Sequence, residues 1–586
     1  MDMHKKFTDR IGPVVTKSHV DLPFEPNTRS CQEWVDDLPI LDAASTAGMM
    51  LTATQGLLST TVAPYTEFKI SEVVSPYVIK LTTLYLKATE GTKLPLSQKQ
   101  AELSTQTLKV LTNAQAVYQN IICSAYFAKN SADESGDDTP IFSKHQKGLI
   151  IHRAVELLGI IQFFESLVYK PTDAGFWNAL NALFTLAEDL QVHQLDYLKV
   201  NGNSHTTIEN EFKKIHFFKL ARPNRFRQGD IKTIQRILSL QANNITMSSN
   251  QEVSTSFYID LSSSKPISHV ATLKEHDQCR FIDNKLLVQF IQSDQLVAPE
   301  RQVTISMTPE KPILSKKVIQ QLLPSWSTQQ SRQSPRYEQT EELTVYPGFD
   351  SVIRALVLKQ NPDYFGKKPA QTTKPRHDFG IDNLHLIPIE ERYKSQHTIN
   401  DTDVNKALKA SAENSLSANS IWTKNLIKPG EKGHSMEATM NDISLQGLRF
   451  QIAANNQALL NANDLIGIQT KTGPLQLAII RRINKLEDGD ISVGVEMMSP
   501  NLKIANIKFH NKELPPKPAI FLQGIPSIHQ PDSIITPLLL NNTAKSIILK
   551  TKDTLNTYRL DKLIETNQVF NHYTVLKESD LDYGKQ

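Results

Sequence analysis

The chain has 586 residues, which is too long for a single hydrophobic core and corresponds to roughly three to four domains. A hydrophobic fraction of 39% and a charged fraction of 21% are ordinary for a globular protein. The formal net charge is only +3, so the chain lacks the overall field that would favour a nucleic acid or an anionic membrane as its partner.

Cysteine usage and hydropathy indicate the compartment. Cys31, Cys123 and Cys279 are far apart and form no C-x-x-C pair, so the sequence suggests neither a disulfide framework nor a zinc site. The N-terminus has no apolar core of signal-peptide length, and no run of about 18 apolar residues predicts a membrane span. We therefore expect a cytoplasmic protein.

The N-terminal third of the chain is predicted to be a loose tail followed by a helical domain. Residues 1–30 are polar and interrupted by prolines, which favours the tail. From about 74 to 219, apolar residues recur at spacings of three and four, which is the period of an amphipathic helix. The helical domain is placed at residues 31–220.

Residues 221–325 are predicted to form a mixed α/β region. Their periodicity changes after a first helix, and several short segments, including 285–292, read as strands. Arg222, Arg225 and Arg227 form a basic cluster that could hold a phosphate, although a solvated helix start is the more ordinary interpretation.

A change of composition precedes a long β-rich region. Residues 360–420 are rich in Lys, Ser, Asn and Ala and poor in large apolar residues, which predicts a mostly disordered insert. After the insert, short and evenly spaced β-like segments joined by turns predict a small antiparallel barrel. Residues 511–586 continue with further predicted strands, as a C-terminal β extension.

The most informative stretch is "MNDISLQGLRF", with the pattern D-x-S-x-x-G. On a strand, residues two apart face the same way, so Asp442 and Ser444 present a carboxylate and a hydroxyl on one face. Gly447 permits either a positive φ or the close approach of a ligand. The carboxylate can accept from the N–H groups of a nucleobase, and the hydroxyl can bind a phosphate. A side-chain turn between two strands is the structural alternative.

The surrounding sequence resembles a known family. "NDISLQGLRF", followed by "LIGIQTK" and by a strand–turn–strand ending in "VGVEMM", resembles the PilZ domain over residues 420–510. That domain is a six-stranded barrel that binds cyclic di-GMP in bacteria. The resemblance implies that Asp442, Ser444 and Gly447 belong to a cyclic di-GMP site, with the dinucleotide as ligand rather than catalytic cofactor. The fold class expected is multidomain α+β, with a C-terminal six-stranded antiparallel PilZ-like barrel and extra strands.

The PilZ family carries a second pattern, R-x-x-x-R, ahead of its first strand. The chain contains this pattern once, as Arg332 and Arg336, and the strand-like segment "ELTVYPG" follows it directly. Since 106 residues separate Arg336 from Asp442, we infer a split barrel at 326–510 with the insert inside it. Such an insert is thermodynamically tolerable because each doubling of loop length costs only about 0.6 kcal/mol.

Other basic residues near the motif are given no role in the site. Lys424 and Lys428 imitate the arginine spacing, but an ammonium cannot meet a guanine edge with a planar fork. Arg449 is expected to be a solvated strand position. Arg481 and Arg482 are expected to point to opposite faces of a strand, so that at most one could reach a ligand.

The resemblance implies a receptor without catalysis, in which an arginine arm folds over an intercalated dimer of cyclic di-GMP. The sequence contains no G-x-x-x-x-G-K-[ST], H-E-x-x-H or G-x-S-x-G motif. The helical domain would then hold a protein partner. The alternative hypothesis is a scaffolding protein with a degenerate barrel that binds no nucleotide. Proximity of the arginine pair to Ser444 would favour the receptor.

Overall fold

The computed structural model describes most of the chain and divides it into two compact units. The first unit is Met1–Leu343 with Glu437–Asp464 and Ala478–Met497, and the second is Thr344–Met436 with Leu465–Leu477 and Met498–Gln586. The described residues are 3–14, 19–89, 94, 96–128, 141–200, 202, 204–273, 278–293, 314–327, 335–360, 435–444, 446–454, 460–498, 502–509, 516–524, 530–537, 546–551, 554–566 and 569–578. The expected insert at 360–420 lies almost entirely outside them.

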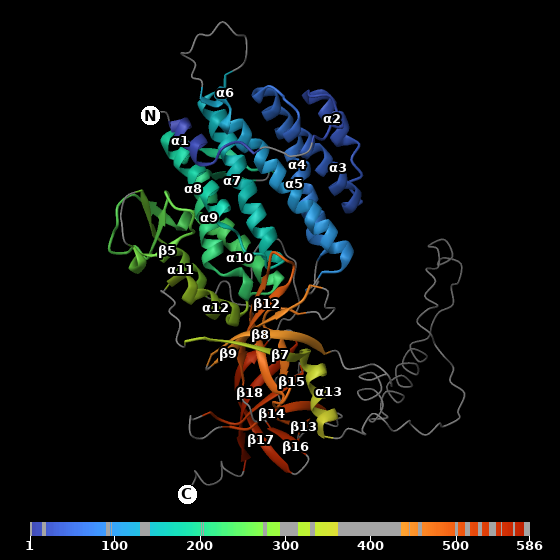
Figure 1. Ribbon diagram of the computed structural model, residues 1–586. Helices are drawn as coiled ribbons and strands as arrows, with labels where there is room; N and C mark the ends of the chain where they lie inside the picture. Colours follow the sequence, from blue (N-terminus) through green and yellow to red (C-terminus); the bar gives the residue numbers. More distant parts are fainter. Residues whose placement is uncertain are drawn as a thin grey trace, which may run out of the picture. The chain divides into compact units, whose positions relative to one another are not determined.

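The N-terminal region is mainly helical, as predicted (Figure 1). Helix α7 is buried along most of its length and packs against α5, α8 and α9. Ser143 and Gln146 form a capping box that starts α7, and the Asp173 side chain accepts from the Phe176 N–H at the start of α8. The elements are α1 (Met3–Arg10), α2 (Thr28–Asp36), α3 (Ala43–Ser59), α4 (Pro64–Ala88), α5 (Gln98–Cys123), α6 (Ala125–Ala128), α7 (Lys144–Leu167), α8 (Ala174–Asp189), β1 (Asp196–Leu198), β2 (His205–Thr207) and α9 (Ile208–Leu220).

The segment expected to be a loose tail contains α1, which packs on the helical domain. Phe7 is buried, His4 hydrogen-bonds to the carbonyl of Ile122, and Arg10 donates to the side chain of Asn178 and to the carbonyl of Leu261. The expectation was therefore wrong for this helix, because one buried aromatic residue and a few long-range polar contacts suffice to hold a short polar segment.

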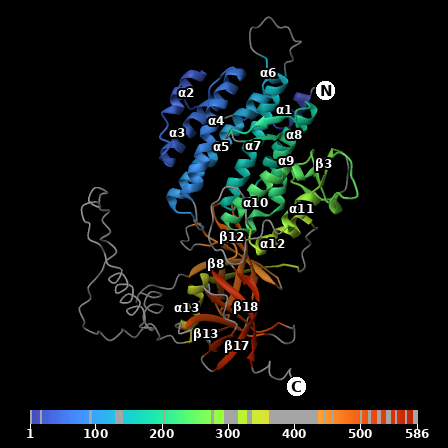
Figure 2. The same ribbon diagram turned by 180° about the vertical axis from the view of Figure 1, so that it is seen from behind.

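The region 221–325 has the predicted mixed composition. A four-stranded sheet of order β3-β6-β4-β5 lies beside α9 (Figure 2). Phe217 of α9 meets Phe257 of β4 edge-on. Residues 285–292 form a helix, not the expected strand, because their apolar residues repeat at helical spacing and bury Leu287 and Ile291. The elements are η1 (Pro223–Arg225), α10 (Gln228–Gln241), η2 (Ala242–Asn244), β3 (Thr246–Ser248), β4 (Phe257–Asp260), β5 (Ser268–His269), η3 (Val270–Thr272), β6 (Cys279–Asp283), α11 (Lys285–Gln292) and α12 (Lys316–Ser327).

A six-stranded antiparallel barrel follows, as predicted. Its strands run in the order β10-β11-β12-β9-β8-β7, so β7 is part of the barrel although residues 361–434 separate it from β8 in sequence. Ile491, Val493 and Val495 of β12 are buried on one face. The elements are β7 (Tyr337–Pro347), α13 (Gly348–Gln360), β8 (Met436–Ser444), β9 (Gly447–Ile452), β10 (Leu465–Thr470), β11 (Gln476–Lys485) and β12 (Ile491–Met497).

The C-terminal strands close into a second barrel, in the order β13-β14-β15-β18-β17-β16. Its core includes Ile507, Phe521, Ile534, Leu549 and Val575. The strands are β13 (Leu502–Phe509), β14 (Lys517–Leu522), β15 (Ser533–Pro537), β16 (Ser546–Lys550), β17 (Leu555–Thr566) and β18 (Phe570–Lys577).

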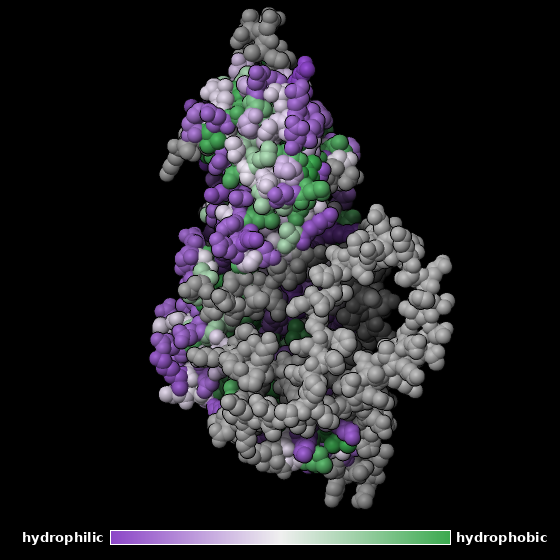
Figure 3. Space-filling model, turned by 90° about the vertical axis from the view of Figure 1, so that its right-hand side faces the viewer, coloured by the Kyte–Doolittle hydropathy of each residue, from purple (hydrophilic) through white to green (hydrophobic). Residues whose placement is uncertain are grey.

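The surface is polar with scattered apolar groups. On the face shown in Figure 3, hydrophilic side chains alternate with smaller hydrophobic groups over the helical elements. Scattered exposed apolar residues of this kind are normal on a protein surface. Of the helices that the structure describes, none is long and apolar enough to cross a membrane.

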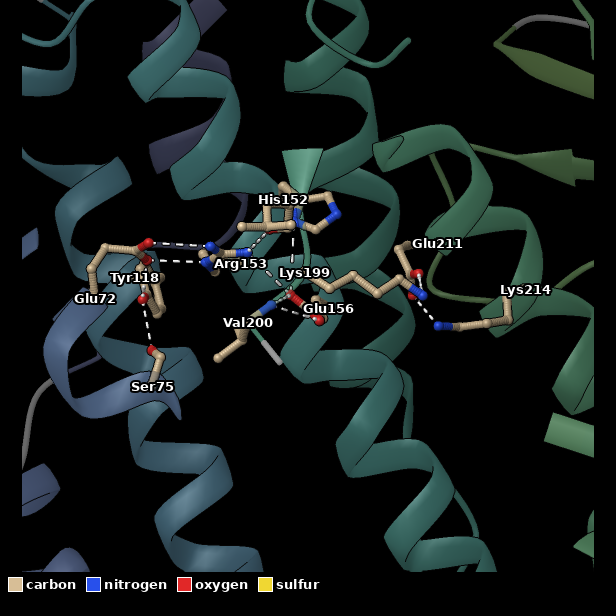
Figure 4. A network of polar contacts seen from close by, with 11 residues as sticks. Glu72, Ser75, Tyr118, His152, Arg153, Glu156, Lys199, Val200, Glu211 and Lys214 are labelled. Atoms are coloured by element: carbon tan, nitrogen blue, oxygen red, sulfur yellow. Dashed lines mark hydrogen bonds and ion pairs between the residues drawn. The ribbon is translucent and has the colours of Figure 1, made fainter. Parts of the chain in front are cut away.

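A buried charge network stabilises the centre of the helical domain (Figure 4). Arg153 of α7 donates through Nε and Nη2 to Glu72 of α4 at 3.0 and 3.2 Å, and through Nη1 to Glu156 at 3.3 Å. Farther along, Glu211 of α9 pairs with Lys199 and Lys214. Burial alone would raise the pKa of Glu211, but the two ammonium groups outweigh it and lower this pKa to about 2.

Glu156 gives this network a pH dependence. Burial raises its pKa to about 7, and the nearby Glu211 carboxylate adds to that rise, whereas Arg153, Lys214 and Lys199 oppose it. Because its pKa is higher in the fold than when unfolded, the stability that Glu156 contributes is present below about pH 4.5 and is lost as the pH rises through 7. Glu156→Gln mimics the neutral carboxyl at every pH. The unfolding free energy of this variant minus that of the original chain should therefore rise by about 3 kcal/mol between pH 4 and pH 8.

Thermal unfolding across this pH range would measure the difference. The exposed Glu102 of α5 offers a matched control, since Glu102→Gln removes a carboxylate that stays in water in both states. If the stability difference between Glu156→Gln and the original chain changed no more with pH than that of the control, the raised pKa of Glu156 would be contradicted.

Candidate functional site

The D-x-S-x-x-G residues lie where β8 turns into β9. Asp442 is only 5% exposed, and two guanidinium groups hold its carboxylate: Arg336 Nη1 lies 2.8 Å from Oδ1, and Arg449 Nε lies 2.7 Å from Oδ2. The Ser444 hydroxyl donates to the carbonyl of Gly447 at 3.0 Å, which fixes the turn. The structure therefore brings Arg336 to Asp442 across 106 residues of sequence. Arg332 lies outside the described residues, as do Lys424 and Lys428.

Gly447 permits a close approach between neighbouring strands. It pairs with Glu496 of β12, and a Cβ atom placed on it would lie 2.0 Å from the carbonyl oxygen of Val495. Its φ is not among the positive values, so the first expected reason for this glycine is not observed, and the approach seen here is that of the neighbouring strand. The partner is the backbone of the next strand.

A cavity of about 600 Å³ opens beside these residues, within the first compact unit. One side is formed by Arg336 and by residues of β9, β11 and β12. The other side is formed by the end of α7 with the segment after it, and by the segment that runs from the end of α9 through η1. No Asp or Glu is among its described lining residues, which include these cations: Lys170, Lys219, Arg222, Arg225, Arg336, Arg449, Arg481 and Arg482.

The barrel supplies one cationic wall of the cavity. We call it the barrel wall and define it as Arg336, Arg449, Arg481 and Arg482. The sequence expectation for the last two was wrong, because both line the cavity. The register of β11 against β12 shifts between Ile480 and Arg482, and such a bulge breaks the strict alternation of side chains. Arg449 is likewise not simply solvated, since it pairs with Asp442 and lines the cavity.

The helical domain supplies a second cationic wall. We call it the helical wall and define it as Lys219, Arg222 and Arg225. Burial lowers the pKa of Arg222 and of Arg225, and neighbouring cations lower both further: Arg482 acts on Arg222, and Arg222 on Arg225. Positive groups brought this close together repel one another, so a bound anion would stabilise the arrangement.

The two walls are joined by contacts that leave the cavity open. Asn224 donates to the side chain of Asn484 at 2.7 Å, and the Lys485 N–H donates to the carbonyl of Tyr169 at 2.9 Å. Arg227 pairs with Asp464 at 2.7 Å and does not line the cavity. Of the basic cluster in the sequence, two members therefore face the cavity and the third holds the walls together.

The chemistry of the cavity suits a compact dianionic or polyanionic ligand. Guanidinium groups bind phosphates bidentately and can also meet the O6 and N7 edge of guanine. A volume of about 600 Å³ is in the range of ligand sites in general. In the described part of the chain, no group of three or more His, Cys, Asp or Glu residues could hold a metal ion.

Comparison with protein families gives two matches. Residues 29–252 match the N-terminal domain of the cyclic-di-GMP receptor FimW, and residues 257–503 match the middle PilZ domain of that receptor. The second match runs across residues 361–434 and includes both Arg336 and Asp442. No curated protein and no solved structure matches the chain.

Proposed function

The chain belongs to the FimW family of cyclic-di-GMP receptors, and on that premise we propose that it is a non-catalytic receptor whose ligand occupies the cationic cavity. The PilZ-domain resemblance is thereby confirmed, and cyclic di-GMP is the ligand of the family. The proposed site consists of Arg332, Arg336, Asp442, Ser444 and Gly447. A cytoplasmic location, expected from the sequence, is part of this proposal.

The contact between Arg336 and Asp442 carries the proposal. A buried carboxylate that accepts from two guanidinium groups, those of Arg336 and Arg449, fixes both cations at the cavity wall. Each group has further donors that can meet a phosphate or a guanine edge. Asp442 then acts chiefly by positioning, Ser444 by closing the turn, and Gly447 by letting the strands approach.

The lining chemistry supports binding without catalysis. Neither a carboxylate nor an imidazole is among the described lining residues, so these offer no ordinary general base for hydrolysing a phosphodiester. Arg332 and Arg336 precede β7, and we expect the ligand to fix this arm in one conformation, which would make it a switch. The helical domain would transmit that switch to a protein partner.

Calorimetric titration with cyclic di-GMP tests the proposal. We expect the original chain to bind and the double variant Arg332→Ala/Arg336→Ala to bind at least tenfold more weakly, because removing one partner of a charged pair costs about 2–5 kcal/mol. Arg559→Ala, on an exposed position of the second barrel, is the matched control and should bind normally.

The other outcomes separate the alternatives. Binding that survives in the double variant would keep the receptor and move the arginine role to other cations of the cavity. Absence of binding in the original chain would reject the receptor and favour the scaffold with a degenerate barrel.

A further inference from the structure

The cavity is lined from two directions, although the PilZ signature accounts for only one of them. The barrel wall contains Arg336 of the signature. The helical wall lies outside the PilZ-like sequence, within residues 29–252 that match the N-terminal domain. A ligand in this cavity would therefore contact both the helical domain and the barrel strands that belong to the first compact unit.

Arg222 has a backbone conformation that its residue type does not favour. It follows Ala221, the C-cap residue of α9, with φ 58° and ψ 64°, and its N–H donates to the carbonyl of Lys219. This left-handed position after a helix is normally filled by glycine, which adopts it without steric cost. An arginine here serves the backbone poorly, so we look to its side chain, which lines the cavity, for the reason.

The opposing cations also lie close enough to interact across the cavity. Burial lowers the pKa of Lys219, Arg222 and Arg225, and the barrel wall lowers each further: Arg482 acts on Lys219 and Arg222, and Arg481 acts on Arg225. The contacts between Asn224 and Asn484 and between Tyr169 and Lys485 hold the walls together despite this repulsion. A ligand with anionic groups on two sides would relieve the repulsion from both directions.

We propose that Lys219, Arg222 and Arg225 form a second half of the cyclic di-GMP site, so that one bound ligand joins the helical domain to the barrel. This inference rests on the proposed function. A cyclic dinucleotide carries its phosphodiester groups on opposite sides of one ring, so it can offer one phosphate to each wall. Cyclic GMP has one phosphate, so it cannot offer a separate phosphate to each wall. The site thereby selects the dinucleotide and couples its binding to the helical domain.

Two substitutions in the helical wall test this inference by titration with cyclic di-GMP. Arg222→Gly removes the guanidinium and supplies the residue that suits φ 58°, so the fold should be retained. Arg225→Ala removes the second guanidinium. We expect each to weaken binding at least tenfold, with partial recovery in Arg225→Lys. Arg236→Ala on the exposed face of α10 is the control for charge alone.

Hydrogen exchange on the original chain supplies a second readout: amides of residues 219–226 should exchange more slowly when cyclic di-GMP is added, and cyclic GMP should have no such effect. Normal binding by Arg222→Gly and Arg225→Ala, beside lost binding in Arg336→Ala, would overturn the second wall and leave the proposed function intact. Absence of binding in the original chain would overturn both.

Discussion

Replacing Gly447 with alanine should disrupt the barrel at the turn that carries the site. The added methyl group would lie 2.0 Å from the carbonyl oxygen of Val495, a backbone atom that no rotamer change can move away. Relief requires β9 and β12 to separate, which breaks the register Gly447–Glu496 and Leu448–Val495. We expect the unfolding free energy to fall by roughly 3 kcal/mol or more, at the upper end of the cost of overpacking.

The neighbouring strand provides a matched control for that substitution. Gly494 of β12 faces Arg449 in the register, and a Cβ atom there would meet only the Cβ of Arg482, at the ordinary distance of 3.6 Å. The unfolding free energy of Gly494→Ala should therefore lie within about 0.5–1 kcal/mol of that of the original chain. Thermal unfolding of both variants measures the contrast, and equal stability of the two would show that Gly447 does not enforce the strand approach.

The sequence predicted much of the fold because the strongest patterns were local. Spacings of three and four identified the helical region that contains α7 and α8, and evenly spaced β-like segments identified the barrel that contains β12. The split of the barrel could be inferred because R-x-x-x-R stands directly before a strand-like segment, and the structure places β7 in the barrel. The helix α11 was misread because a short apolar run fits a strand and a helix equally well.

The cavity could not be predicted, because it depends on tertiary geometry. A one-residue bulge turns both Arg481 and Arg482 toward it, against the alternation rule. The cluster that begins at Arg222 was visible in the sequence, but nothing there indicated that it would face the barrel. The pairing of Arg449 with Asp442 follows from the strand register, which the sequence does not specify. The two walls are therefore a result of folding rather than of any single motif.

Arg153→Met should strongly destabilise the helical domain. The arginine is 7% exposed and donates to Glu72, to Glu156 and to the carbonyl of Leu198, the last at 2.7 Å. Methionine retains the apolar stem but leaves the buried Glu156 and the half-buried Glu72 without their shared cation. Removing one partner of a buried ion pair typically costs about 3–5 kcal/mol, and we expect a loss of this size in the unfolding free energy.

An exposed ion pair of the same domain shows how much of that loss depends on burial. Arg29 and Glu33 of α2 lie 3.1 Å apart, but their side chains are 90% and 68% exposed. Arg29→Met should therefore change the unfolding free energy by less than about 1 kcal/mol. Circular dichroism during thermal unfolding would compare the variants, and a small effect at Arg153 would mean that water reaches the network. Since α7 leads directly into Lys170 and Thr172 at the cavity, a loosened network should also weaken the helical side of the ligand site.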